Sequence, residues 1–231
     1  MLPFITRVLR LLLGLFLLAL GIVFTISAQI GYSPWEIFHS GLTVQTGITM
    51  GNAAIVVSVL ITIIVFFLGE SFGFGSLLNM FLVGIFVDLI LDSRIIPMCN
   101  DEAFLSTIRH INVTPLSDNL FFGSIMLIIG LYIIALSGYF YIGSGFGAGP
   151  RDSLMVALTR ITKLPVGFCR SVMEFIAAFI GWLLGGFIGI GSVISVLAIG
   201  FCVQTTFKAL GFKPTEIKHE SIAETLAGFR K

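Results

Sequence analysis

Apolar residues run through most of this chain in stretches that are long enough to cross a lipid bilayer. A hydrocarbon core of about 30 Å needs roughly 20 helical residues. We predict membrane-spanning helices at residues 8–30, 52–69, 75–92, 119–144, 166–186 and 190–208. Only short corners separate the second span from the third and the fifth from the sixth, so each of these pairs is predicted to form a tight helical hairpin.

The landmarks of the chain repeat after 116 residues without a gap. Seven glycines coincide in this register, whereas chance overlap of two such halves would match roughly one or two. The coinciding glycines are Gly14 and Gly130, Gly31 and Gly147, Gly51 and Gly167, Gly69 and Gly185, Gly73 and Gly189, Gly75 and Gly191, and Gly84 and Gly200. The sequence therefore predicts an internal duplication, with residues 1–92 as the first repeat and residues 117–208 as the second.

Each repeat also contains a short segment that is opened by proline. Residues 34–47 and 150–165 are predicted to form one short helix per half, either interfacial or re-entrant. If these segments crossed the membrane, Arg151 and Arg160 would enter the bilayer at a cost of about 2.5–3.5 kcal/mol for each deeply placed charge. Six spans are therefore favoured over eight.

Three spans in each half make an odd number, so the second half would be inverted relative to the first. The predicted fold is an all-α membrane protein with six transmembrane helices in a 3+3 inverted-topology repeat. Secondary transporters are often built in this way, with their binding site between the two halves.

Composition and charge support the membrane assignment. A hydrophobic content of 57% with 11% charged residues leaves too little polar surface for a soluble globular protein. Of 13 lysines and arginines, eleven fall on one side of the six-span arrangement, which identifies that side as cytoplasmic. Both termini are then cytoplasmic, residues 93–116 form an outer connecting loop, and residues 209–231 form a cytoplasmic amphipathic tail.

Polar side chains inside the predicted spans are few. Asp88 and Gln204 occupy equivalent positions in the two repeats, as do Asn79 and Ser195. A carboxylate that faces lipid is costly, so these residues are candidates for the lining of a substrate or ion pathway. The other interpretation is helix packing through the neighbouring glycines, with the polar groups hydrogen-bonded across the contact.

Three further acidic residues are pathway candidates. Glu36 and Asp152 are equivalent and follow the two helix-opening prolines, where they can cap the helix N-terminus or mark two gates or an ion-coupling position. Glu174 either pairs with Arg170 one turn earlier or points inward as a proton-carrying carboxylate. His39 lies in a predicted outer segment and is expected at the surface.

The corner before the last span of each half carries a repeated pattern of glycines followed by serine. Such a corner can present free amides at a helix N-terminus and hold an anion, although a tight hairpin also needs glycine simply to turn. The candidate residues of this helix-corner motif are Gly73, Gly75, Ser76, Gly189, Gly191 and Ser192.

No pattern in the sequence is typical of an enzyme. Phosphate-binding GxxxxGK[ST], HExxH and GxSxG motifs are all missing, and the three cysteines have no metal-ligand spacing. We predict no catalytic residue, no metal, no cofactor and no nucleic-acid partner. The expected partners are the lipid bilayer and a small molecule or ion as substrate, and the bundle could also form a homo-oligomer.

Two stretches resemble the YczE/YyaS/YitT-like family of bacterial integral membrane proteins. They are Gly31-Tyr-Ser-Pro-Trp-Glu36 and Gly145-Phe-Gly-Ala-Gly-Pro-Arg-Asp152, each followed by further glycines, and the resemblance covers about residues 5–207. It implies a multi-pass protein of the bacterial cytoplasmic membrane, but it implies no substrate.

These observations favour a transporter that moves a small solute or ion by alternating access between two inverted halves. The alternative is a non-transporting accessory protein that binds and stabilises a membrane partner. Transport predicts a cavity shared by polar residues of both halves, whereas an accessory role predicts a packed interior and an outward patch of small residues.

Overall fold

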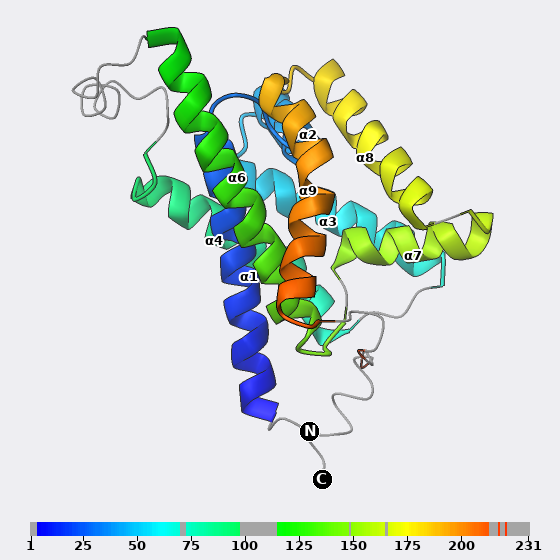
Figure 1. The fold of residues 1–231 in the computed structure, drawn as a ribbon. Coiled ribbons are helices and arrows are strands. Elements are labelled where there is room, and N and C mark those ends of the chain that lie inside the picture. Colours follow the sequence, from blue (N-terminus) through cyan, green and yellow to red (C-terminus); the bar gives the residue numbers. More distant parts are fainter. Residues whose placement is uncertain are drawn as a thin grey trace.

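The computed structural model describes residues 4–69, 73–97, 115–147, 149–164 and 166–212, together with Ile217 and Glu220. Within these residues all regular structure is helical. The helices are α1 (Phe4–Ser27), α2 (Pro34–Thr46), α3 (Met50–Phe67), α4 (Phe74–Ser93), α6 (Pro115–Ile142), α7 (Pro150–Thr162), α8 (Val166–Leu183) and α9 (Ile190–Ala209). A helix lies at each predicted span and at both predicted short helices, so the all-helical fold class is confirmed (Figure 1).

Five of the described helices are long and apolar enough to cross a membrane, namely α1, α3, α4, α6 and α9. In α8, the shorter stretch Ser171–Leu183 is apolar. The short helices α2 and α7 have 13 residues each, which corresponds to only about 20 Å of helix. The chain is therefore a multi-pass membrane protein.

Both short helices begin and end in the same way. Pro34 and Pro150 begin these helices. Proline suits this position because the first N–H groups of a helix have no partner within the helix, so the missing N–H costs no hydrogen bond. The residues after their last turns, Gly47 and Lys163, are equivalent in the repeat, and both adopt the left-handed conformation, with φ of 73° and 58°. The two short helices are thus alike in backbone conformation at their C-terminal ends, as the predicted duplication expects.

The centre of the fold is the crossing of α1 and α6, which are equivalent helices. They run antiparallel, because Gly14 near the start of α1 faces Tyr141 near the end of α6, while Gly123 near the start of α6 faces Ala28. A Cβ built on Gly14 would lie 2.5 Å from the backbone nitrogen of Tyr141. Glycine therefore allows the two helices to approach closely.

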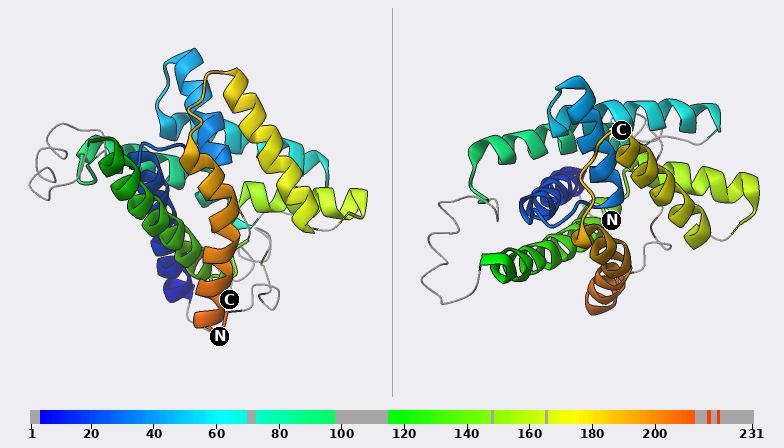
Figure 2. Two further views of the ribbon diagram at one scale, coloured as in Figure 1. Left: turned by 45° about the horizontal axis from the view of Figure 1, so that its top comes forward. Right: turned by 90° about the horizontal axis from the view of Figure 1, so that it is seen from above.

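The two predicted repeats contact each other through their short helices. The short helix α2 packs along α8 of the second repeat, and α7 packs along α3 of the first (Figures 1 and 2). Within each repeat, by contrast, α4 packs on α1 and its equivalent α9 packs on α6. The contact between α3 and α4 lacks such a counterpart, since the described parts of α8 and α9 pack only marginally against each other.

Two of the predicted regions fall largely outside the described residues. They are the outer connecting loop at residues 93–116 and the cytoplasmic tail at residues 209–231. Glu220 of the tail is described, and its carboxylate forms an ion pair with Arg7 at 2.7 Å. The backbone N–H of Glu220 also donates to the carbonyl oxygen of Gly145 at 2.9 Å.

Candidate functional site

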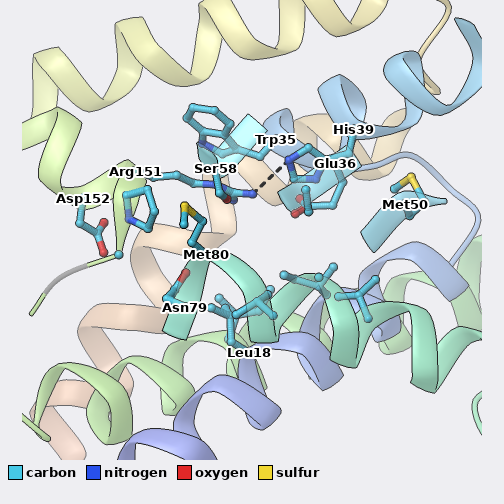
Figure 3. Close-up of a pocket in the computed structure, with 18 of the residues that line it drawn as sticks. Leu18, Trp35, Glu36, His39, Met50, Ser58, Asn79, Met80, Arg151 and Asp152 are labelled. Carbon is cyan, nitrogen blue, oxygen red and sulfur yellow. Dashed lines mark hydrogen bonds between the residues drawn. The ribbon is translucent and has the colours of Figure 1, made fainter. Parts of the chain in front are cut away.

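A cavity of about 170 Å³ lies where the N-termini of the two short helices meet. Its walls come from α1, α2, α3, α4, α6, α7 and α8, so both repeats contribute (Figure 3). Much of the lining is apolar, with four methionine side chains among aliphatic residues. The polar part of the wall includes Glu36, His39, Asn79, Arg151, Asp152 and Glu174.

Residues that are equivalent in the two repeats line this same space. Glu36 is the equivalent of Asp152, and Trp35 is the equivalent of Arg151. In each pair, one residue comes from the first turn of α2 and the other from the first turn of α7, directly after the opening proline. The two helix N-termini therefore converge on one cavity at the junction of the halves.

Arg151 joins the two sides of the cavity. Its Cζ atom lies 4.6 Å from the centroid of the Trp35 ring, a cation–π contact between α7 and α2. Its Nη2 atom lies 3.4 Å from Nε2 of His39 (Figure 3). Burial lowers the pKa of the Arg151 guanidinium, and the negative charges of Glu36, Asp152 and Glu174 oppose this shift.

The two equivalent carboxylates have different surroundings. Glu36 is only 3% exposed, and burial raises the pKa of its carboxyl, while the positive charge of Arg151 acts in the opposite direction. Asp152 is partly exposed and accepts a hydrogen bond of 3.0 Å from the Tyr141 hydroxyl. One carboxylate of this pair is thus buried, and the other is hydrogen-bonded and more open.

The structure brings four of the seven predicted pathway residues to the cavity, namely Glu36, Asn79, Asp152 and Glu174. The other three lie elsewhere. Ser195 is buried and donates to the carbonyl oxygen of Gly191 at 2.7 Å, and Gln204 is exposed on α9. A pathway role for these residues stays a prediction.

Asp88 lies at the contact between α4 and the first turn of α3. Its carboxylate accepts a hydrogen bond from the Thr49 hydroxyl and another, of 2.8 Å, from the Gly51 N–H. These bonds satisfy donors at the start of a helix and place a negative charge near its positive dipole end. Here Asp88 serves helix packing, and its part in a pathway stays a prediction.

The predicted helix-corner motifs form a reciprocal joint between the repeats. The Gly75 N–H donates to the carbonyl oxygen of Phe146 at 2.8 Å, and the Gly191 N–H donates to the carbonyl oxygen of Ile30 at 2.7 Å. These two bonds are equivalent in the register of 116 residues. In each corner one amide is therefore already used by the other half, and anion binding there stays a prediction.

The remaining residues of both motifs lie at the same joint. Ser76 and Ser192 are buried, and the Gly189 N–H donates to the Ser192 hydroxyl at 3.2 Å. A Cβ built on Gly73 would lie 1.9 Å from the oxygen of Phe146, and one built on Gly189 would lie 2.2 Å from the oxygen of Ile30. Glycine is required at these positions for close approach of the two backbones.

Sequence reasoning missed three functional groups of the cavity. His39 was expected at the surface, but it is 3% exposed and lines the cavity, so that expectation is wrong. Arg151 and Tyr141 were not proposed as site residues, although Arg151 lies directly before Asp152 and is the equivalent of Trp35. The predicted pair of Glu174 with Arg170 cannot be followed, since the Arg170 side chain lies outside the described residues.

Comparisons with known proteins agree with the membrane assignment. Residues 5–208 match the model of a family of unknown function, DUF6198. Over 194 residues the chain is 33% identical to the uncharacterised membrane protein YczE of Bacillus subtilis, with 83% of this chain and 80% of YczE covered. An uncharacterised protein of Haemophilus influenzae is 28% identical over 194 residues, with coverages of 84% and 80%.

The uncharacterised protein YyaS of Bacillus subtilis is 27% identical over 193 residues, with 83% of this chain and 88% of YyaS covered. No solved structure matches the chain significantly. The resemblance to YczE and YyaS that the two proline motifs indicate is confirmed.

Proposed function

We propose that this chain, which belongs to the family of unknown function DUF6198, moves a small solute or ion across the membrane by alternating access. The observation that carries the proposal is the cavity at the junction of the repeats, whose polar wall is built from equivalent residues of both halves. Inverted-repeat transporters hold their substrates at such a junction. An accessory protein would need no polar cavity there.

The antiparallel crossing of α1 and α6 supports the inverted arrangement of the halves. A two-fold axis along the membrane normal would leave equivalent spans parallel, whereas an axis in the membrane plane makes them antiparallel. Gly14 packs against Tyr141, and its equivalent Gly130 packs against Thr25, the equivalent of Tyr141. Reciprocal contacts of this kind are the signature of a two-fold relation.

In the proposed topology, α1, α3, α4, α6, α8 and α9 cross a bacterial cytoplasmic membrane, and both termini face the cytoplasm. The short helices α2 and α7 then enter the bilayer from opposite faces. Their N-termini meet at the cavity, which resembles the use of broken helices around midplane sites in transporters.

Cysteine accessibility tests this function without knowledge of the substrate. Asn79→Cys, in a chain with its three native cysteines replaced by serine, places a thiol in the cavity wall. A membrane-impermeant thiol reagent should label it in both right-side-out and inside-out vesicles, because the cavity opens to each face in turn. Ser195→Cys, at the equivalent but buried position, is the matched control and should stay unlabelled.

Labelling of Asn79→Cys from a single face would contradict alternating access. Labelling from neither face would indicate a closed, packed interior and would favour the accessory role.

A further inference from the structure

We propose that the ion coupled to this cavity is a proton and that Glu36 carries it. The inference deepens the proposed transport function and rests on that function for its physiological meaning. The chemistry comes from three features of the cavity: the burial of Glu36, the negative charge of Glu174 nearby, and the different surroundings of Glu36 and Asp152.

Glu36 is the most buried acidic group in the cavity wall. With 3% of its surface exposed, it faces a space that is large enough for a few water molecules. A carboxyl in such a place exchanges a proton with cavity water at little structural cost, and its ionised form is penalised by burial.

Burial favours a proton on Glu36, while the nearby charges act in both directions: Arg151 favours the ionised form and Glu174 opposes it. The titratable and charged side chains that face it are His39 on α2, Tyr141 on α6, Arg151 and Asp152 on α7, and Glu174 on α8. Among the described lining residues, Arg151 is the one permanent cation, and its charge is shared by three carboxylates. Glu36 is the most buried of these carboxyls, so a proton on Glu36 removes both its own burial penalty and its repulsion by the negative charge of Glu174.

A comparison of Glu36 with its equivalent Asp152 indicates why Glu36 is the carboxyl that we propose to hold the proton. Asp152 is more exposed and accepts the Tyr141 hydroxyl, an arrangement that suits an ionised acceptor. Glu36 has no donor from another helix in the described contacts and relies on the guanidinium of Arg151. Paired acidic groups in different environments commonly divide the acid and base roles in this way.

The cavity is poorly suited to a metal ion as the coupled species. Hard divalent cations take six or more oxygen ligands. Among the described residues there is no group of three or more His, Cys, Asp or Glu side chains that could hold a metal ion. A proton, in contrast, needs only one carboxyl that water can reach.

Protonation of Glu36 would act on the link between the halves. The guanidinium of Arg151, on α7, stacks on Trp35, on α2, and ionised Glu36 next to Trp35 attracts it further. Addition of a proton to a Glu36 oxygen removes that attraction and leaves the stacking contact. The attraction between α2 and α7 is then weaker, so proton binding is coupled to the relative movement of these two helices.

Infrared spectroscopy of the full chain in lipid measures the proton directly. At neutral pH the wild type should show the C=O stretching band of a protonated carboxyl, and Glu36→Gln should lack it. Asp152→Asn, the matched control, should keep the band. Glu36→Asp serves if the glutamine variant folds poorly, and it should keep a band at a shifted frequency.

An unchanged band in Glu36→Gln, or no protonated carboxyl in the wild type, would overturn the proton assignment. This measurement needs no transport, so its failure leaves the cysteine-labelling test of alternating access untouched. Conversely, labelling of Asn79→Cys from a single face would contradict alternating access but would not affect the assignment of a proton to Glu36.

Discussion

In the first repeat, α3 and α4 meet at two glycines, whereas their equivalents α8 and α9 in the second repeat diverge from their connecting corner (Figures 1 and 2). A Cβ built on Gly84 would lie 2.5 Å from the carbonyl oxygen of Gly51. A Cβ built on Gly200, the equivalent of Gly84, would have nothing within 4 Å. We call the α3–α4 hairpin closed, because its two helices are packed together, and the α8–α9 hairpin open.

The difference is informative because Gly200 contributes no close contact in this structure. Glycine inside a helix lowers helix stability by about 1 kcal/mol relative to alanine, so a glycine that makes no close contact destabilises α9 without a packing benefit. In the alternating-access scheme that we propose, α8 closes on α9 in a second state, and α3 then leaves α4. Gly200 would be needed in that state, as Gly84 is needed in this one.

The joint between the repeats is the region where both halves behave alike, and it should give the largest effects. Gly73→Ala and Gly189→Ala each force a methyl group against a carbonyl oxygen of the other repeat. Each should lower the free energy of unfolding by about 3 kcal/mol or more, because backbone atoms cannot move aside as side chains do. Denaturant titration in mixed micelles measures this loss.

Gly200→Ala is the control for these two variants, since open space surrounds that position. A large loss in one of the joint variants with none in the other would contradict the equivalence of the two corners.

The closed and open hairpins are compared by Gly84→Ala and Gly200→Ala. Gly84→Ala should destabilise the protein by about 1–3 kcal/mol through overpacking against α3. Gly200→Ala should be neutral or stabilising by up to about 1 kcal/mol, because alanine is the better helix former. Micellar unfolding measures both values.

The same pair of variants separates stability from conformational exchange. If Gly200 packs against α8 in a second state, Gly200→Ala should change the ratio of Asn79→Cys labelling from the two membrane faces. An unchanged ratio would show that the open hairpin does not close.

Much of this fold could be predicted because it depends on local and repeated signals. Hydropathy located the helices, and proline located both short helices to within a few residues. The register of 116 residues also identified Glu36 and Asp152 as a pair, and both line the cavity. These signals belong to single helices or to the duplication itself.

The contents of the cavity were harder to predict, because they depend on which helices of opposite halves pack together. The charge pattern assigned Arg151 to a cytoplasmic segment, but its guanidinium stacks on the Trp35 ring of α2. Asp88 looked like a costly charge in a span, but the N-terminal donors of α3 satisfy it. Neither contact has a local signature in the sequence.

Asp88 and Gln204 test whether the closed hairpin is held by its carboxylate. Asp88→Ala removes the acceptor of the Thr49 hydroxyl and the Gly51 N–H and should cost about 1–3 kcal/mol. Gln204→Ala, at the equivalent exposed position, should change stability by less than about 0.5 kcal/mol. Equal unfolding midpoints for Asp88→Ala and the wild type would instead favour a pathway role for Asp88.

The smallest effect should come from Glu36 and should depend on pH. Because burial raises the pKa of the Glu36 carboxyl, the native protein keeps this proton at pH values where the unfolded chain has lost it. The contribution of this proton to the stability of the wild type should therefore be fully present below the ordinary pKa range of glutamate and be lost as pH rises through the raised native pKa.

Glu36→Gln cannot lose a proton, so its stability should lack this decline, and the advantage of the variant over the wild type should grow with pH. Asp152→Asn retains Glu36 and should retain the decline, which makes it the matched control. Thermal unfolding of the three proteins in one micelle system, from mildly acidic to mildly alkaline pH, measures the difference. A wild-type profile parallel to that of Glu36→Gln would mean that the buried carboxyl is already ionised, and the two halves would then hold equivalent carboxylates after all.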